Sequence, residues 1–271
     1  MAKIVAIVNQ KGGVGKTTTC VNLTAALHQL GKRVLLCDFD PQANATSGMG
    51  VDKTVSNGVY DVLINGKDVK SAVVATHYGD VLPSSKALAG AGIEMIEMEN
   101  RQFLLKQALD QVRDTYEFIF IDCPPSLELL TINALTCATG VLIPVQCEYY
   151  ALEGIADLVR SIKMCNRGLN PELGIEGIVM TMYDGRTKLS DQVVTEVRRF
   201  FGKKVYKTMI PRNVRLSEAP SHRKPAIAYD KESKGSRAYL HLASEMLKRE
   251  EKAAEKAKKE KAKAEEADGE G

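Results

Sequence analysis

Tryptophan is absent from this chain, and only 6% of its 271 residues are aromatic. Its six cysteines are scattered, mostly inside apolar runs, and no two of them form a C-x-x-C pair. Zinc sites and dithiol redox centres commonly use such pairs, so the spacing argues against a metal site built on cysteine. It predicts buried free thiols instead, as in proteins of a reducing cytoplasm.

Long hydrophobic stretches are also missing. No apolar run approaches the length of a membrane span, which argues against a transmembrane helix. The short apolar stretch near the N-terminus is too brief for a signal peptide and leads directly into a glycine-rich loop. We therefore expect a cytoplasmic protein that does not bind a membrane.

A large excess of charge of either sign is missing as well. The formal net charge is +3, with 44% hydrophobic and 26% charged residues, as in ordinary globular proteins. Residues 248–271 hold eight basic and eight acidic side chains, so the positive excess belongs to the rest of the chain. A mildly basic body permits contact with nucleic acid or an anionic surface without requiring it.

The composition changes after Leu247. Residues 248–271 consist mostly of Lys, Glu and Ala, and they cannot bury enough apolar surface to pack as a core element. We expect a solvated tail that is disordered or loosely helical, with a contact to DNA or a partner as the alternative. Residues 1–247 are expected to form one domain.

Strand-like apolar runs alternate with helix-like segments along residues 1–247. Several runs are nearly continuous Val, Ile and Leu, which is typical of parallel strands buried on both faces. The alternation predicts an α/β fold, a doubly wound and mostly parallel sheet with helices on both faces. The expected strands are Lys3–Asn9, Arg33–Asp38, Asp80–Pro83, Phe118–Asp122, Val141–Gln146, Ile175–Met182 and Val205–Ile210. The expected helices are Lys16–Leu30, Asn100–Thr115, Leu127–Ala138, Glu153–Cys165, Ser190–Phe201 and Lys234–Leu247.

The most informative segment is Lys11–Thr18, which reads K-G-G-V-G-K-T-T. It follows an apolar run and precedes a helix-like segment, which is the context of a phosphate-binding loop. The strict pattern would place glycine at position 10, where this chain has Gln10. Backbone N–H groups of such a loop converge on phosphate oxygens at a helix N-terminus. We expect nucleotide contacts from Gly12, Gly13, Val14, Gly15, Lys16, Thr17 and Thr18.

Two side chains of this loop have predicted chemical roles. Lys16 should reach the β- and γ-phosphates, and the Thr17 hydroxyl should bind Mg²⁺ directly. Lys11 has no role within such a loop, so it needs one elsewhere.

Two later apolar runs end in carboxylates. Asp38 closes the first run and Asp40 follows two residues on, so both side chains point to one side of an extended chain. Asp122 closes the second run, which has the form of a Walker B strand whose carboxylate holds Mg²⁺, often through water. Isolated aspartates at strand ends can be simple turn formers. After a phosphate loop, this order favours a magnesium site in which Asp38 and Asp122 act through water.

These segments resemble the ParA/Soj family of chromosome and plasmid partitioning ATPases, which carry a deviant Walker A loop. The resemblance implies binding of ATP and Mg²⁺, slow ATP hydrolysis stimulated by a ParB/Spo0J-like partner, an ATP-dependent homodimer and non-specific binding of double-stranded DNA. It also implies a cytoplasmic, nucleoid-associated location. It covers most of residues 1–247 and is carried by Lys11–Thr18, Asp38–Thr46, Ile121–Ser126 and Pro211–Ser221.

The resemblance assigns catalytic roles to three residues. Lys11 matches the signature lysine, which crosses the dimer interface to the partner's phosphates and resembles an arginine finger in its electrostatic role. Asp40 matches the carboxylate that positions or activates the attacking water. With Lys16, these residues form the implied catalytic set.

Other positions match the family's binding residues. Met182, Pro211 and Asn213 correspond to residues that frame the adenine. Arg186 and Arg215 correspond to residues that contact DNA; such contacts reach phosphates and are therefore salt-sensitive and independent of sequence. Ala43 stands where many relatives have glycine, and it would be strained there if the position needs a positive φ.

Three other functions share parts of this pattern. A MinD-like membrane-cycling division regulator shares the loop, but it would end in a basic amphipathic helix with bulky apolar residues, unlike the Ala-rich tail. A DNA-bound regulator that does not hydrolyse nucleotide would not need both Asp40 and Asp122. An electron-transfer ATPase of the nitrogenase iron-protein type would need cysteines facing a shared cluster, whereas packing in the core is the favoured role of Cys123.

Overall fold

A six-stranded parallel sheet forms the centre of the computed structural model, which describes residues 1–149 and 151–268, with side chains left out at 152, 153 and 261–268. The strand order is β3-β2-β4-β1-β5-β6, and every neighbouring pair is parallel. The expected doubly wound α/β fold is thus confirmed. The strands are β1 (Lys3–Ile7), β2 (Val34–Asp38), β3 (Asp80–Leu82), β4 (Phe118–Asp122), β5 (Gly140–Gln146) and β6 (Gly174–Thr181).

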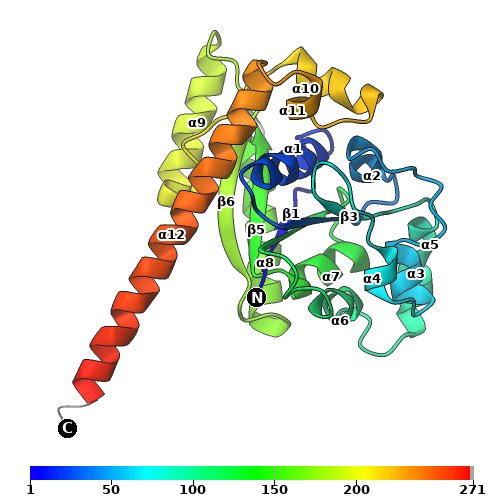
Figure 1. Ribbon diagram of the computed structural model, residues 1–271. Helices are drawn as coiled ribbons and strands as arrows, with labels where there is room; N and C mark the ends of the chain where they lie inside the picture. The colour runs from blue at the N-terminus through cyan, green and yellow to red at the C-terminus, as the bar shows by residue number, and fades with distance from the viewer. Residues whose placement is uncertain (150, 269–271) are drawn as a thin grey trace.

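Helices cover both faces of the sheet (Figure 1). The longer ones are α1 (Lys16–Gln29), α7 (Leu129–Cys137), α8 (Ala151–Gly168), α9 (Lys188–Phe201) and α12 (Lys234–Asp268). The shorter ones are α2 (Asn44–Gly48), α3 (Val59–Ile64), α4 (Val69–Ala72), α5 (Leu88–Glu94), α6 (Leu104–Asp110), α10 (Val214–Glu218) and α11 (Ala226–Tyr229), with 3₁₀ turns at Met95–Glu97, Gly202–Lys204 and Ala219–His222.

Alternate residues of each strand enter two separate cores, because side chains of a strand point to opposite faces. In β1, Val5 and Ile7 join the core that includes α1 and α12. Ile4 and Ala6 join the larger core on the other face, where α6, α7 and α8 pack. Both faces of the sheet are therefore buried, as the continuous apolar runs predict.

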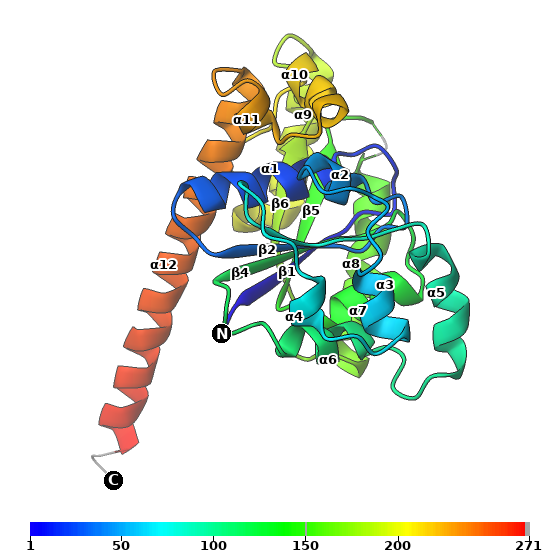
Figure 2. The same cartoon turned by 45° about the vertical axis from the view of Figure 1, so that its right-hand side comes forward.

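The structure differs from the sequence-based prediction at three of the expected elements and adds the short helices α2, α3, α4 and α5, which the sequence did not predict. The helix expected at Asn100–Thr115 is shorter, because only Leu104–Asp110 is helical and the residues on both sides form turns. The strand expected at Val205–Ile210 is wrong, because only Val205 forms a bridge, to Ile178, and the rest is irregular. The last helix does not end at Leu247 but continues to Asp268, and in both views its far end extends away from the molecule (Figures 1 and 2). Within residues 248–268, Ala, Glu and Lys have high intrinsic helix propensity, and Glu and Lys side chains four residues apart attract each other. These local effects favour a helix even where no core covers it.

Candidate nucleotide site

Three strands end together at one edge of the sheet and carry the predicted carboxylates there. Asp38 closes β2 and Asp122 closes β4, and their Cα atoms are direct partners in the parallel register. Ile7, at the end of β1, is the partner of Asp122 on its other side. The loop that follows β1 therefore begins beside both carboxylates, as expected for a ligand site at the carboxyl ends of parallel strands.

The phosphate-binding loop needs two glycines for its shape. Gly13 and Gly15 have φ angles of 75° and 90°, a left-handed region that other residues rarely adopt. Gly15 is also the N-cap of α1, and it offers no side chain to the first N–H groups of that helix. These donors are consequently free of side-chain caps at an electropositive helix end, which is the arrangement that binds phosphate.

Side chains from neighbouring strands hold the loop in place. The Asn9 amide donates to the Pro144 carbonyl at 2.8 Å, and its oxygen accepts from the Lys11 backbone N–H at 3.0 Å. The Thr181 hydroxyl donates to the Val14 carbonyl at 2.8 Å. The loop is thus tied to β5 and β6 independently of any nucleotide.

Lys16 is the cation inside the loop. It is only 7% exposed, and its Nζ donates to the Lys11 carbonyl at 3.2 Å. Burial lowers the pKa of its ammonium, while the nearby Asp122 carboxylate opposes that shift. A buried cation with so few partners gains when an anion such as a phosphate approaches.

Asp38 and Asp122 form a completely buried carboxylate pair. Asp38 Oδ2 accepts hydrogen bonds from the backbone N–H and the hydroxyl of Thr46, at 2.6 and 2.7 Å. Burial raises the pKa of the Asp38 carboxyl to about 6, despite these hydrogen bonds. Burial, and then the adjacent Asp38 charge, raise the pKa of Asp122 well above its usual range.

The surroundings of Asp122 fit a cation. Both of its carboxylate oxygens are buried and lack a hydrogen bond of good geometry within the described part of the chain, although the Thr17 side chain lies near enough to oppose the rise in the Asp122 pKa. Oxygen ligands of this kind suit Mg²⁺, which binds through few carboxylates and keeps several waters. Thr17 is the second residue of α1, the helix that directly follows the phosphate-binding loop. The residues present thus fit the magnesium role that the sequence predicts for Thr17, Asp38 and Asp122.

Asp40 lies just beyond the end of β2 and is partly exposed. Its carboxylate accepts from the Gln42 backbone N–H at 2.9 Å, and its own N–H donates to Asp38 Oδ1 at 3.2 Å. Ala43 follows in the same loop with a φ angle of 52°. The position therefore does require the left-handed conformation that the sequence comparison suggested, and Ala43 occupies it with strain.

Lys11 points away from the interior of its own loop. Its Nζ donates to Glu148 Oε2 at 2.8 Å, and its side chain is 46% exposed. Glu148 follows β5 directly, at the same edge of the sheet. The sequence analysis did not identify Glu148, although an acidic residue at the carboxyl end of an expected strand was a signal that could have found it.

A cavity of about 390 Å³ adjoins the loop and has the size of a small-ligand site. Asn213 Oδ1 is buried there without a hydrogen-bond partner among the described residues, so it is an unused acceptor. Tyr239 of α12 also lines the cavity, and its hydroxyl lies 3.1 Å from the Thr19 hydroxyl. The predicted base-framing residues meet in this lining, which comprises Gly15, Thr18, Thr181, Met182, Ile210, Pro211, Arg212, Asn213, Val214, Leu216, Ser217, Pro220 and Tyr239.

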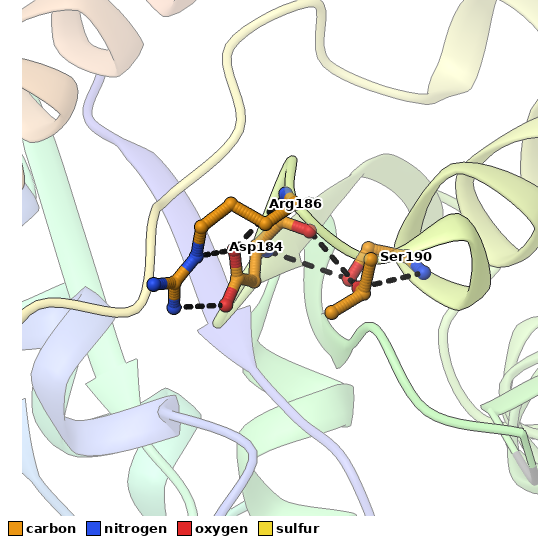
Figure 3. A network of polar contacts seen from close by, with 4 residues as sticks. Asp184, Arg186 and Ser190 are labelled. Atoms are coloured by element: carbon orange, nitrogen blue, oxygen red, sulfur yellow. Dashed lines mark hydrogen bonds and ion pairs between the residues drawn. The ribbon is translucent and has the colours of Figure 1, made fainter.

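The two arginines predicted to contact DNA both lie near this end of the sheet and both have acidic partners. Arg186, in the loop between β6 and α9, forms a two-pronged pair with Asp184 (Figure 3). Arg215, in α10, contacts Glu218 at 2.8 Å and Asp230 at 3.2 Å. The sequence analysis did not anticipate these carboxylates, which come from turns and short helices.

The cysteines take no part in the site. All six are buried free thiols, as expected, and burial raises the pKa of the Cys123 thiol well above its usual range. Within residues 1–149 and 151–268, no group of three or more His, Cys, Asp or Glu side chains could hold a metal ion. No helix of the same ranges is both long and apolar enough to cross a membrane.

Comparison with known proteins agrees with this geometry. A family model described as an AAA domain matches residues 2–175. The sporulation initiation inhibitor protein Soj of Bacillus subtilis is 56% identical over 91% of this chain and 98% of its own length. The chromosome partitioning protein ParA of Myxococcus xanthus is 48% identical over 92% of this chain and 89% of its own length.

A solved structure shares the whole architecture. The cobyrinic acid a,c-diamide synthase of Mycobacterium smegmatis with bound ADP and magnesium superposes with a TM-score of 0.80, at 36% identity, over 91% of this chain and 94% of that one. The similarity to Soj and ParA extends over nearly the full length of this chain, and it agrees with the loop, the carboxylate pair and the sheet. This chain therefore belongs to the ParA/Soj family of chromosome-partitioning ATPases.

Proposed function

We propose that this chain is a slow ATPase that dimerises on binding ATP and Mg²⁺, and that its ATP-bound dimer binds double-stranded DNA without sequence specificity. It acts in chromosome or plasmid partitioning with a ParB/Spo0J-like partner, in the cytoplasm and on the nucleoid. Residues 1–247 supply the nucleotide-binding domain, and residues 248–271 are a charged tail whose first residues, Arg249 and Glu250, contact that domain.

One observation carries the proposal. The loop contains two lysines, but only Lys16 is buried within it; Lys11 is exposed at the rim and held by Glu148. In the proposed dimer, this exposed cation meets the nucleotide of the second copy, where it stabilises charge on the transferring phosphate. Its position is what distinguishes this site from a phosphate loop that works alone.

Each residue of the site then has a physical task. Bound ATP–Mg²⁺ supplies the phosphoryl group to be transferred to water. Gly13 and Gly15 shape the loop so that backbone donors face phosphate oxygens, and Lys16 contributes the charge. Asp40 orients the attacking water and accepts its proton, which it can do because it is the partly exposed carboxylate of the three.

Control of DNA binding by nucleotide follows from the number of phosphate contacts. Affinity for DNA depends steeply on that number, and a monomer presents a single copy of Arg186 and Arg215. A dimer doubles the number of phosphate contacts. Because the dimer forms only with ATP, the nucleotide state determines how long the protein stays on DNA.

The decisive experiment measures DNA binding with ATP and with ADP, for the wild type and for an Arg186→Ala/Arg215→Ala double variant. We expect tight, salt-sensitive binding only by the wild type with ATP. Equal binding in all four cases would contradict the proposal.

A further inference from the structure

The segment Val205–Ile210 leads from the end of α9 into the cavity beside the loop, yet it is not a regular strand. It meets β6 at two backbone hydrogen bonds, from Tyr206 N–H to the Ile178 carbonyl at 2.9 Å and from Ile210 N–H to the Met180 carbonyl at 2.8 Å. Between these anchors, the N–H groups of Lys207 and Thr208 have no strand beside them. The Thr208 N–H is partly buried, and a donor in such a place is costly to leave without an acceptor.

Glu245 of α12 supplies the missing acceptors. Its Oε1 accepts from the Lys207 N–H at 2.8 Å, and its Oε2 accepts from the Thr208 N–H at 2.9 Å. A single carboxylate thus takes the place of a neighbouring strand. Hydrogen bonds to a charged acceptor are stronger than those between neutral backbone groups.

Arg249, one helical turn further along α12, reinforces this contact. Its Nη2 donates to Glu245 Oε1 at 2.8 Å and to the Val205 carbonyl at 2.9 Å. Its guanidinium carbon lies 3.8 Å from the centre of the Tyr206 ring. The Tyr206 ring in turn packs on Gly177, where an added Cβ would come within 2.4 Å of it.

The carboxylate is pre-organised rather than loosely placed. The side chain of Glu245 is 17% exposed. Burial acts to raise its pKa, but the N–H groups of Lys207 and Thr208 and the Arg249 guanidinium outweigh burial and lower it. Glu245 is therefore charged at neutral pH, and it accepts both hydrogen bonds as a carboxylate.

The segment that Glu245 holds continues directly into the cavity. Ile210, Pro211 and Asn213 all line it, and the first of these is only two residues after Thr208. Helix α12 also contributes Tyr239 to the same lining. One helix therefore lines the cavity and also holds the segment that leads into its lining.

We propose that Glu245 is a positioning residue for recognition of the nucleoside base, acting through the backbone of Lys207 and Thr208. The proposal rests on the proposed ATPase function, with the base of ATP in this cavity, where Met182, Pro211 and Asn213 meet. Adenine carries a donor amino group at the position where guanine carries an acceptor carbonyl. The unused acceptor Asn213 Oδ1 can accept a hydrogen bond from the adenine amino group but repels the guanine carbonyl. This selectivity requires that the segment leading to Asn213 is held in place.

Displacement of the segment should therefore reduce selectivity for the base more than binding of the phosphates. The phosphate loop is tied to the sheet by Asn9 and Thr181, neither of which depends on α12. Binding of a ligand without a base, such as tripolyphosphate, thus measures the loop alone. The difference between its affinity and that of ATP measures the contribution of the segment that Glu245 holds.

The test compares Glu245→Ala and Glu245→Gln in the full-length chain with Glu251→Ala, a control that removes an exposed acid of the same helix. Equilibrium binding is measured for ATP, GTP and inorganic tripolyphosphate, each with Mg²⁺. We expect Glu245→Ala to weaken ATP binding about tenfold, a loss typical of charge-assisted hydrogen bonds, and to bring the ATP-to-GTP affinity ratio towards one. Tripolyphosphate binding should stay constant, and Glu245→Gln, which keeps one acceptor, should fall between.

Amide hydrogen exchange provides a second readout. The amides of Lys207 and Thr208 should exchange faster in both Glu245 variants, whereas those of the phosphate loop should not change. If Glu245→Ala does not fold, the same comparisons are made with Glu245→Gln, which changes neither the size nor the shape of the side chain.

The outcomes separate the two proposals. If the wild type binds no nucleotide, the proposed function itself fails. If the wild type selects ATP but the Glu245 variants keep the same ATP-to-GTP ratio, or lose tripolyphosphate binding in parallel, Glu245 has only a general structural role and the inference is overturned. A wild type that binds ATP and GTP equally would also overturn it.

Discussion

Arg186 donates hydrogen bonds from Nε and Nη2 to the two carboxylate oxygens of Asp184, at 2.9 and 2.7 Å (Figure 3). The arginine is 88% exposed, and the aspartate is 23% exposed. Asp184 thus occupies the guanidinium edge that a DNA phosphate would use, since carboxylate and phosphate are both bound by arginine in this two-pronged way. In the proposed function, a DNA phosphate would therefore have to replace the Asp184 carboxylate on Arg186.

Asp184→Asn is therefore expected to strengthen DNA binding by the ATP-bound protein, by no more than about fivefold, the range expected for an exposed ion pair. The hydrogen bonds of Arg186 lower the pKa of Asp184 to about 2, so the carboxylate stays charged and the effect should be constant between pH 6 and about pH 8. Fluorescence anisotropy with a labelled duplex over a range of salt concentrations checks this. Asp157→Asn, which breaks an Asp–Arg pair on α8, is the control and should change nothing.

Lys11 should become freer when its acidic partner is removed. Because the Lys11–Glu148 pair is about half exposed, Glu148→Gln is expected to shift ATP-dependent dimerisation by no more than about fivefold, in favour of the dimer. Lys11→Ala should abolish the dimer while ATP still binds. Light scattering with ATP and with ADP measures both. A loss of dimer in Glu148→Gln would mean that Glu148 contributes to the interface instead of competing for Lys11.

Asp40→Ala should stop hydrolysis and trap the ATP-bound dimer, because the water would lose its base while the loop and the buried carboxylates stay intact. The release of phosphate should fall by about two orders of magnitude or more. Crosslinking with ATP should capture the dimer. A monomeric Asp40→Ala protein under these conditions would show that Asp40 has another role.

Ala43 offers a test of backbone strain. Its φ angle of 52° lies in the left-handed region, so Ala43→Gly is expected to stabilise the protein by about 0.5–1 kcal/mol and to raise its melting temperature by about 1–3 °C. Ala89→Gly, on the exposed surface of α5, should have the opposite sign, because glycine weakens a helix. Thermal unfolding without nucleotide compares the two. If Ala43→Gly lowers the melting temperature as Ala89→Gly does, Ala43 is not strained.

Truncation distinguishes the two parts of α12. Ending the chain after Lys252 keeps Arg249 and the pairs of Lys3 with Glu176 and Glu250, so stability and ATP binding should be close to those of the full chain. Ending it after Leu247 removes Arg249 and Glu250 and should lower stability by about 1–3 kcal/mol. Urea unfolding of both proteins measures the difference. If the chain that ends after Lys252 loses DNA binding while it keeps its stability, the removed part of the charged tail contacts DNA.

Much of the site could be predicted from local sequence. The phosphate loop needs glycine at Gly13 and Gly15 because only such residues readily adopt the required φ, and that requirement is visible as a motif. Asp38 and Asp122 could be predicted because each ends an apolar run, and parallel strands carry their carboxyl ends to one edge. The alternation of the runs likewise determined the fold class, since strands buried on both faces must be apolar throughout.

Only the tertiary structure decided which side chains from distant segments meet. The segment Val205–Ile210 has the composition of a strand, but Gly177 and Tyr206 bring it against β6 in a way that leaves two donors to Glu245. The pairing of Lys11 with Glu148 joins residues 137 positions apart. Local propensity and periodicity carry no information about such contacts, because they depend on how the helices and strands pack. The sequence by itself therefore determined the loop, the sheet and the carboxylates, and the packing decided what holds them in place.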